Sequence, residues 1–173
     1  MDAATIQKIT IWILPVLLAV SLHEAAHAWM ADRKGDSTAR MLGRLTFNPI
    51  KHIDPIGTIL VPALMLTFTG FAFGWAKPVP IDVRNLSNPK KDMIWVALAG
   101  PASNFIMAIL WAVFLNISVF FVNSESSVSM FFLLMPVAGI MINVILGVLN
   151  LLPVPPLDGG RIMAGLFPPP ASI

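Results

Sequence analysis

The sequence contains no cysteine and little charge, and each absence narrows the class of protein. Without cysteine it has neither disulfides nor thiolate ligands, so any bound metal must use histidine, carboxylate or water. Charged residues make up 12% of its 173 residues, about half the share of a soluble domain. Asp, Glu, Lys and Arg are missing altogether from residues 55–76, 94–122 and 128–157. The length is that of a single domain, predicted to cover residues 1–173.

The long uncharged runs indicate an integral membrane protein. Residues 94–122 and 128–157 both exceed the roughly 20 apolar residues that cross a bilayer. An earlier apolar run, residues 9–22, reaches that length only if the helix continues through residues 23–27. This continuation places two histidines and a glutamate at membrane depth, an expensive position that calls for a functional reason. No Ala-x-Ala site closes the run, so we do not expect a cleaved signal peptide.

The distribution of basic residues predicts the orientation of the chain. Residues 32–54 and 77–93 hold most of the lysines and arginines, whereas residues 123–127 hold none. Both basic stretches are therefore expected on the cytoplasmic side, and residues 123–127 outside. The uncharged segment 55–76 would then enter and leave on the same side as a re-entrant element, with a fourth spanning helix as the alternative. The basic residues lack interleaved aromatic residues, which argues against nucleic-acid binding.

Residues His23-Glu24-Ala25-Ala26-His27 form the pattern H-E-x-x-H. On a helix, positions i and i+4 share one face, so both imidazoles can bind a single metal ion. Glu24 lies beside them and can act as the general base that takes a proton from water activated by zinc. The alternative, two satisfied core histidines, leaves three polar groups inside an apolar helix without a compensating ion.

A catalytic zinc site usually has three protein ligands, and Asp158 is the predicted third. It is the only other acidic residue that follows a long apolar run, and prolines and glycines surround it in residues 150–160. Such a sequence breaks the helix and allows the carboxylate to turn toward a neighbouring helix. The alternative is that Asp158 only caps a short helix over residues 159–166.

These motifs resemble those of the site-2 protease family of intramembrane metalloproteases. The family shows H-E-x-x-H on one helix and N-x-x-P-x-P-x-L-D-G on another, as residues 23–27 and 150–159 do here. Residues 100–104, Gly-Pro-Ala-Ser-Asn, are similar to its Gly-Pro-x-x-Asn motif, and residues 74–80 to a segment of its compact prokaryotic members. The resemblance implies a three-helix catalytic core, one zinc ion per chain and membrane-spanning protein substrates cut at or near the bilayer.

Further expectations concern Asn104 and the extent of the chain. Asn104, polar within an apolar run, either holds the substrate carbonyl or oxyanion as a catalytic residue or joins helices through hydrogen bonds. His52 is expected to be an ordinary interfacial histidine, and Arg161 to reach toward the headgroups. No stretch is long enough for a PDZ or CBS domain. The family usually continues with further helices after the Asp-Gly-Gly segment, so the sequence is expected to be a truncated or minimal form.

The sequence thus predicts an all-α integral membrane protein with a three-helix core and a re-entrant or short β segment between its first and second core helices. It would be a multi-pass protein of the cell membrane with its active site toward the cytoplasm. The predicted activity is zinc-dependent hydrolysis of peptide bonds in membrane-spanning segments, and residues 55–80 could pair with the extended substrate. A zinc transporter is the main alternative, although a transporter does not need a non-ligating base between its ligands. The oligomeric state is left open.

Overall fold

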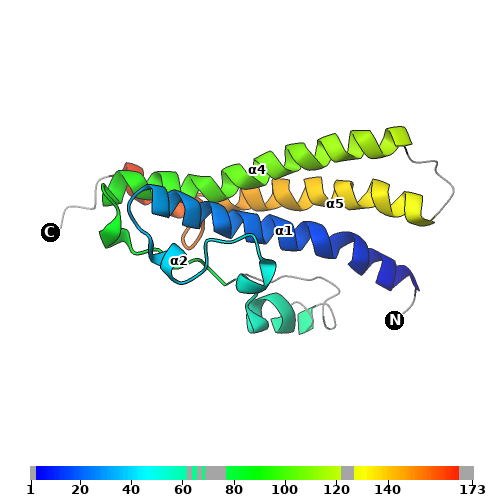
Figure 1. Ribbon diagram of the computed structural model, residues 1–173, viewed down its shortest axis with the longest axis horizontal. Coiled ribbons are helices and arrows are strands. Elements are labelled where there is room, and N and C mark those ends of the chain that lie inside the picture. Colours follow the sequence, from blue (N-terminus) through cyan, green and yellow to red (C-terminus); the bar gives the residue numbers. More distant parts are fainter. Residues whose placement is uncertain (1–2, 62–63, 66–67, 69–76, 122–126, 168–173) are drawn as a thin grey trace.

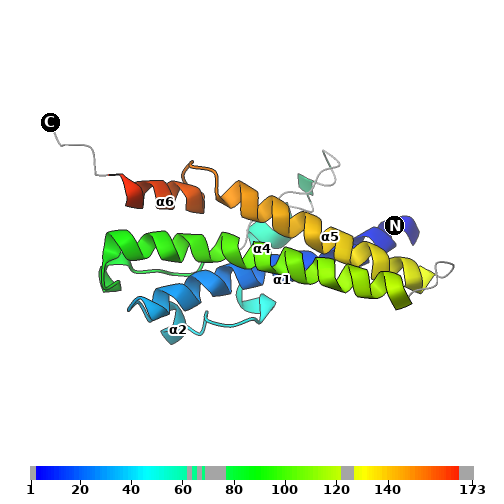
Figure 2. The same cartoon turned by 90° about the horizontal axis from the view of Figure 1, so that it is seen from above.

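Three long helices lie side by side along the molecule in the computed structural model (Figure 1). They are α1 (Ala3–Arg33), α4 (Pro89–Phe121) and α5 (Ser127–Asn150), and each packs against the other two. A shorter helix, α6 (Asp158–Leu166), follows α5 and packs against α4 (Figure 2). The structure describes residues 3–61, 64–65, 68, 77–121 and 127–167.

The sequence explains where these helices pack closely. A Cβ atom on Gly139 of α5 would lie 2.4 Å from the indole of Trp111 on α4, so only glycine lets the two helices approach there. Trp111 also packs against a small core formed by Ile11, Met135 and Ala138. Each long helix contains one interior proline, which is tolerated in membrane helices because neighbouring groups satisfy the freed carbonyl.

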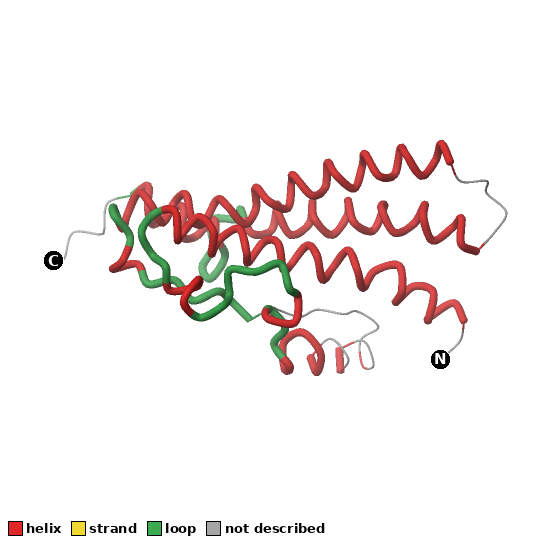
Figure 3. Tube along the Cα trace, in the orientation of Figure 1, coloured by secondary structure: helices red, strands yellow, loops and turns green. Residues whose placement is uncertain are grey.

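Three of these helices are long and apolar enough to cross a bilayer, over Ile9–Arg33, Pro89–Phe121 and Ser129–Asn150. Their outer surfaces expose large apolar side chains, such as Ile109 and Leu110 on α4, which suits contact with lipid. The prediction of an all-α, multi-pass membrane protein is confirmed at this level, and the described residues contain no strand (Figure 3). The helices α1 and α4 begin about one and a half turns before their apolar runs because polar residues extend them beyond the predicted spans.

The two basic stretches meet at one end of the bundle, which we call the polar end. Helix α1 ends there at Arg33, a turn follows with Gly35, whose φ of 110° requires glycine, and the short helix α2 (Thr38–Met41) comes next. The backbone N–H of Ser87 donates to Lys34 O at 2.9 Å, which fixes the second stretch beside the first. A single-turn 3-10 helix, Pro49–Lys51, precedes a π-helical turn over Pro55–Leu60, and a further 3-10 turn covers Val83–Asn85.

The predicted re-entrant or β segment falls mostly outside the described residues. Its flanks are described and lie next to each other, because Lys77 N–H donates to His52 O at 2.9 Å. Helix α1 runs toward the polar end, α4 runs away from it and α5 returns to it (Figure 1). The last turns of α1 and the first turn of α6 therefore come together.

Candidate metal centre

Helix α1 presents two histidines on one face near the polar end. His23 and His27 are one turn apart, and both side chains are buried, with 7% and 4% of their surface exposed. Their Nε2 atoms lie 3.0 Å from each other. The i and i+4 spacing therefore places the two rings as the sequence predicts.

The hydrogen bonds of the other ring nitrogens determine which nitrogen of each imidazole carries the proton. His27 Nδ1 lies 2.7 Å from the backbone carbonyl of Val96 on α4, and His23 Nδ1 lies 2.6 Å from Asn104 Oδ1. A carbonyl oxygen only accepts, so each Nδ1 must donate. In the neutral imidazoles both Nε2 atoms then carry lone pairs directed at each other, which is the state that binds a metal.

Asn104 is fully buried, and its amide orientation follows from its other contacts. Its Nδ2 donates to Ala19 O at 3.2 Å and to Asn143 Oδ1 at 2.9 Å. Asn143, also fully buried, donates in turn to Gly139 O. With all three bonds made inside the bundle, this arrangement favours orientation of His23 by Asn104 over contact with substrate. Asn143 was not among the residues predicted from the sequence, although a lone asparagine in the apolar run 128–149 was a signal.

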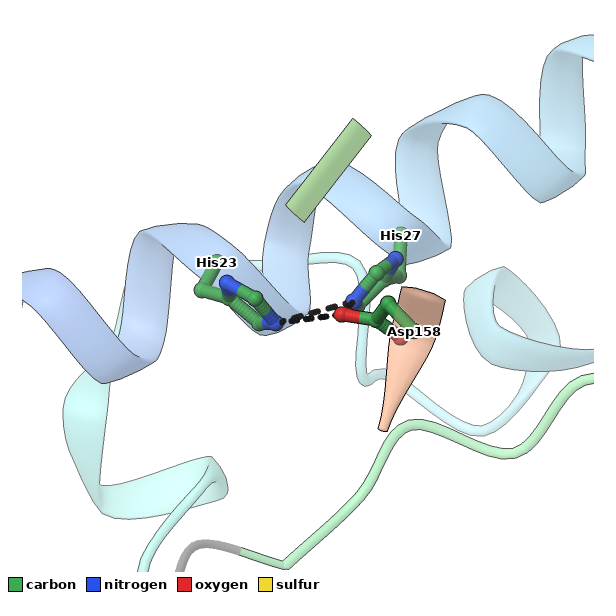
Figure 4. A group of neighbouring side chains, drawn as sticks. All are labelled: His23, His27 and Asp158. Atoms are coloured by element: carbon green, nitrogen blue, oxygen red, sulfur yellow. Dashed lines mark hydrogen bonds and ion pairs between the residues drawn. The ribbon is translucent and has the colours of Figure 1, made fainter. Parts of the chain in front are cut away.

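Asp158 reaches the histidines from the start of α6 (Figure 4). Its Oδ2 atom lies 3.2 Å from Nε2 of both His23 and His27. The turn before it is very tight, because a Cβ atom on Gly159 would lie 2.2 Å from Leu152 O. Leu157 occupies the N-cap position of α6 and makes no side-chain capping bond. The carboxylate thus faces the histidines and not the N-terminus of its own helix, against the capping alternative.

These three atoms fit a zinc ion. Two unprotonated nitrogens and one carboxylate oxygen within 3.2 Å repel one another unless a cation or a proton lies between them. Asp158 Oδ2 is buried and accepts no hydrogen bond. Ligands about 2.0–2.1 Å from a tetrahedral zinc are about 3.3 Å apart, close to the separations observed here. No other described group of histidines and acids is close enough to form such a site.

The electrostatics of Asp158 agree with a ligand role. Burial acts to raise the pKa of its carboxyl group, but positive charge on the facing His23 and His27 Nε2 atoms, where a cation would otherwise lie, outweighs this effect. Its pKa therefore lies below the ordinary value, and the group is an anion. On the other side, Arg161 Nη1 lies 3.7 Å from Asp158 Oδ1. The guanidinium is half-exposed beside the site. The sequence predicted only that Arg161 reaches toward the headgroups, and not this contact with Asp158.

Glu24 faces the same small cavity as the three candidate ligands. The cavity has a volume of about 140 Å³, and Pro78, Val79 and Asn150 also line it, which leaves room for several waters. Glu24 Oε2 accepts a hydrogen bond from the backbone N–H of Val79 at 2.7 Å. Every residue except proline carries a backbone N–H group, so the residue types alone could not predict this contact.

Of two further polar residues, Asn150 lines the cavity and His52 does not. Asn150 donates from Nδ2 to Leu146 O within α5, which agrees with a structural role at the helix end. His52 is 1% exposed and bonds through Nε2 to Thr46 O at 2.9 Å, so its side chain is buried within the protein. It lies outside the group of candidate ligands.

Comparisons with known proteins point in one direction. A profile of "Peptidase family M50" matches residues 116–170. The chain is 39% identical over 163 residues to the Bacillus subtilis protein named "Putative zinc metalloprotease YwhC", covering 91% of this chain and 69% of that protein. It is 34% identical over 143 residues to the Mycolicibacterium smegmatis protein named "Putative zinc metalloprotease Rip2", and it spans 52% of that relative's length. No solved structure gives a significant match.

Proposed function

Because this chain belongs to Peptidase family M50, the site-2 protease family, we propose that it hydrolyses peptide bonds in membrane-spanning protein segments. One zinc ion per chain would be held by His23, His27 and Asp158. The observation that carries this proposal is the meeting of three lone-pair atoms within 3.2 Å, from helices far apart in the sequence. Bound there, zinc supplies a Lewis acid that polarises the scissile carbonyl and acidifies water.

Proton transfer and orientation of the imidazoles are assigned to residues around the metal site. Glu24 accepts the proton from the attacking water and passes it to the leaving amine, because its carboxylate faces the cavity without standing among the three candidate ligands. Asn104 and the Val96 carbonyl keep the two imidazoles in the tautomer that binds metal. Asn104 is thus proposed as an orienting residue of the catalytic centre.

The size of the cavity bears on the substrate. A helix holds its carbonyl groups in internal hydrogen bonds and is about 10–12 Å wide with its side chains, whereas the space beside the candidate ligands is a small cavity of about 140 Å³. A spanning substrate must therefore unwind locally before its carbonyl reaches the site. Pairing of the unwound strand with residues 55–76 stays a prediction outside the described residues. In residues 77–79 the backbone N–H groups of Lys77 and Val79 are already engaged.

The location of the site follows from charge and packing together. The candidate ligands lie within the last three turns of α1 and at the start of α6, and basic residues are numerous in both polar stretches. By the positive-inside tendency, we place the polar end at the cytoplasmic face of the cell membrane. The segment 55–76 then starts and ends on that face as a re-entrant element.

The test uses the full chain reconstituted in vesicles with a single-span substrate. Glu24→Gln should retain zinc but lose at least about 100-fold in cleavage rate, because glutamine cannot accept the proton. The double change His23→Ala, His27→Ala should lose the zinc itself, measured by mass spectrometry of the metal. Full turnover by Glu24→Gln would contradict the base role, and metal retained by the double variant would contradict the site.

Zinc transport is the rival, since it also places histidine and carboxylate at membrane depth. The same vesicles, loaded with a zinc-sensitive dye, distinguish the two functions. We expect no zinc flux above empty vesicles in the preparation that cleaves substrate. Flux that depends on His23 and His27, without cleavage, would establish transport instead.

A further inference from the structure

An extended segment of the polar end crosses α1 beside the candidate metal centre. We call residues 77–82 the strap. Its central N–H group, that of Val79, donates to Glu24 Oε2 at 2.7 Å. The Val79 side chain is buried and packs with Ala28 and Ala39. The strap thus holds one oxygen of Glu24 with its backbone and is itself held by apolar packing.

Contacts on both sides of Val79 fix the strap in place. Before it, Lys77 N–H donates to His52 O, and the Arg44 guanidinium donates to Lys77 O at 2.9 Å. After it, the N–H of Asp82 donates to the fully buried carboxylate of Asp36 at 2.7 Å. A segment with these contacts is held in a fixed position, which distinguishes it from a plug that a substrate would displace.

Within the strap, neither neighbour of Val79 in the sequence has a backbone N–H group to offer. These neighbours are Pro78 and Pro80, so a one-residue shift of the strap would leave Glu24 without a partner. In the part of the chain that the structure describes, this is the only hydrogen bond that Glu24 accepts. The second carboxylate oxygen of Glu24 is left for the cavity that Glu24 shares with His23, His27 and Asp158.

A carboxylate next to two histidine ligands is a potential zinc ligand itself, since glutamate oxygens bind zinc about as closely as aspartate oxygens do. A glutamate that joined the ligands could no longer act as a base. We propose that the Val79 N–H, presented by the strap, holds Glu24 outside the ligand set and directs its free oxygen toward the cavity. Val79 is then a positioning residue, and its effect on cleavage rests on the proposed protease function.

Substitution of cobalt for zinc provides a test that does not depend on activity, because the visible absorption of cobalt(II) reports the number and type of its ligands. Val79→Pro removes the N–H and keeps an apolar side chain, whereas Val79→Ala keeps the N–H. We expect the Val79→Ala spectrum to match wild type and the Val79→Pro spectrum to differ. Adding Glu24→Gln to Val79→Pro should return the spectrum to the wild-type form. An unchanged Val79→Pro spectrum, or a change that Glu24→Gln does not reverse, would overturn the proposal.

Cleavage by the same variants gives a second readout. The kcat of Val79→Pro should be at least about tenfold below that of Val79→Ala, with similar KM, because the base is lost and not the substrate contact. A higher kcat in Val79→Pro would show that the strap obstructs the site, and would refute positioning.

Two outcomes require a further measurement: a Val79→Pro variant that does not fold, and a wild-type protein that does not cleave. If Val79→Pro does not fold, replacement of the Val79 amide by an ester removes the same N–H while it preserves the backbone shape, and the expectations are the same. If the wild-type protein does not cleave the substrate, the proposed function fails, and the cobalt spectra still decide whether the strap controls Glu24.

Discussion

At the scale of single residues, Gly100 sets how closely α4 approaches the candidate metal centre. A Cβ atom there would lie 2.4 Å from His27 Nε2 and 2.7 Å from His23 Cε1. Since both imidazoles are held by α4 through their other nitrogens, they have little room to move away. We therefore expect Gly100→Ala to weaken zinc binding by about 10–100-fold, the range found when the surroundings of metal ligands are disturbed. Competition with a chromophoric chelator measures this.

Gly147→Ala is the matched control for that change. It adds the same methyl group to a membrane helix, but the new Cβ atom would meet the end of the Phe105 ring at 3.0 Å. Zinc affinity should stay at the wild-type level in this variant. Equal affinity for zinc in Gly100→Ala and wild type would contradict the described fit of α4 against the histidines.

At the scale of elements, Asp36 joins the end of α1 to the strap. Its buried carboxylate accepts hydrogen bonds from Thr38, from the N–H of Asp82 and from Asn85 Nδ2. Burial raises the pKa of Asp36, but these hydrogen bonds outweigh it and leave the pKa below the ordinary value. The stabilisation is therefore fully present above the unfolded pKa of about 3.9 and is lost as the pH falls through the lower folded pKa.

We expect Asp36→Asn to flatten the acid side of the stability profile. Thermal unfolding in detergent between neutral pH and about pH 3 should show a smaller loss of stability than in wild type. At neutral pH the variant should be less stable by about 1.5–3 kcal/mol, the size of a hydrogen bond to a charged group. Asp2→Asn, which removes a carboxylate near the amino terminus, is the control. An acid limb as steep in Asp36→Asn as in wild type would exclude this role.

At the scale of the whole molecule, the direction of the three long helices predicts which segments share a side of the membrane. Ser37 and Ser87 both lie at the polar end, where Ser87 Oγ donates to Lys34 O at 3.0 Å. Single cysteines at these positions should react with an impermeant thiol reagent from the cytoplasmic face only. A cysteine at Ser126, between α4 and α5, should react from outside, and the native chain has no cysteine to interfere.

Labelling of positions 37 and 87 from opposite faces would require residues 55–76 to cross the membrane. It would also contradict the contact between the two polar stretches. Labelling of all three positions from one face would instead contradict the crossing by α4.

The sequence by itself determined the class of the protein and the chemistry available to it. The uncharged runs 94–122 and 128–157 specify spanning helices because no irregular backbone is stable against lipid. The i and i+4 spacing places His23 and His27 on one face because the α-helix has a fixed pitch. Asp158 could be predicted because a charged group after an apolar run, among prolines and glycines, has few other uses. These inferences rest on local geometry and on the cost of polar groups in hydrocarbon.

Only the tertiary structure decided how those residues are held. The proton positions on His23 and His27 depend on Asn104 and the Val96 carbonyl, which lie 81 and 69 residues away in the chain. The partner of Glu24 is a backbone N–H, a group that every residue except proline carries and that no pattern can single out. The need for glycine at position 100 likewise comes from the approach of another helix. Such contacts arise from packing between distant segments, and residue type alone does not encode them.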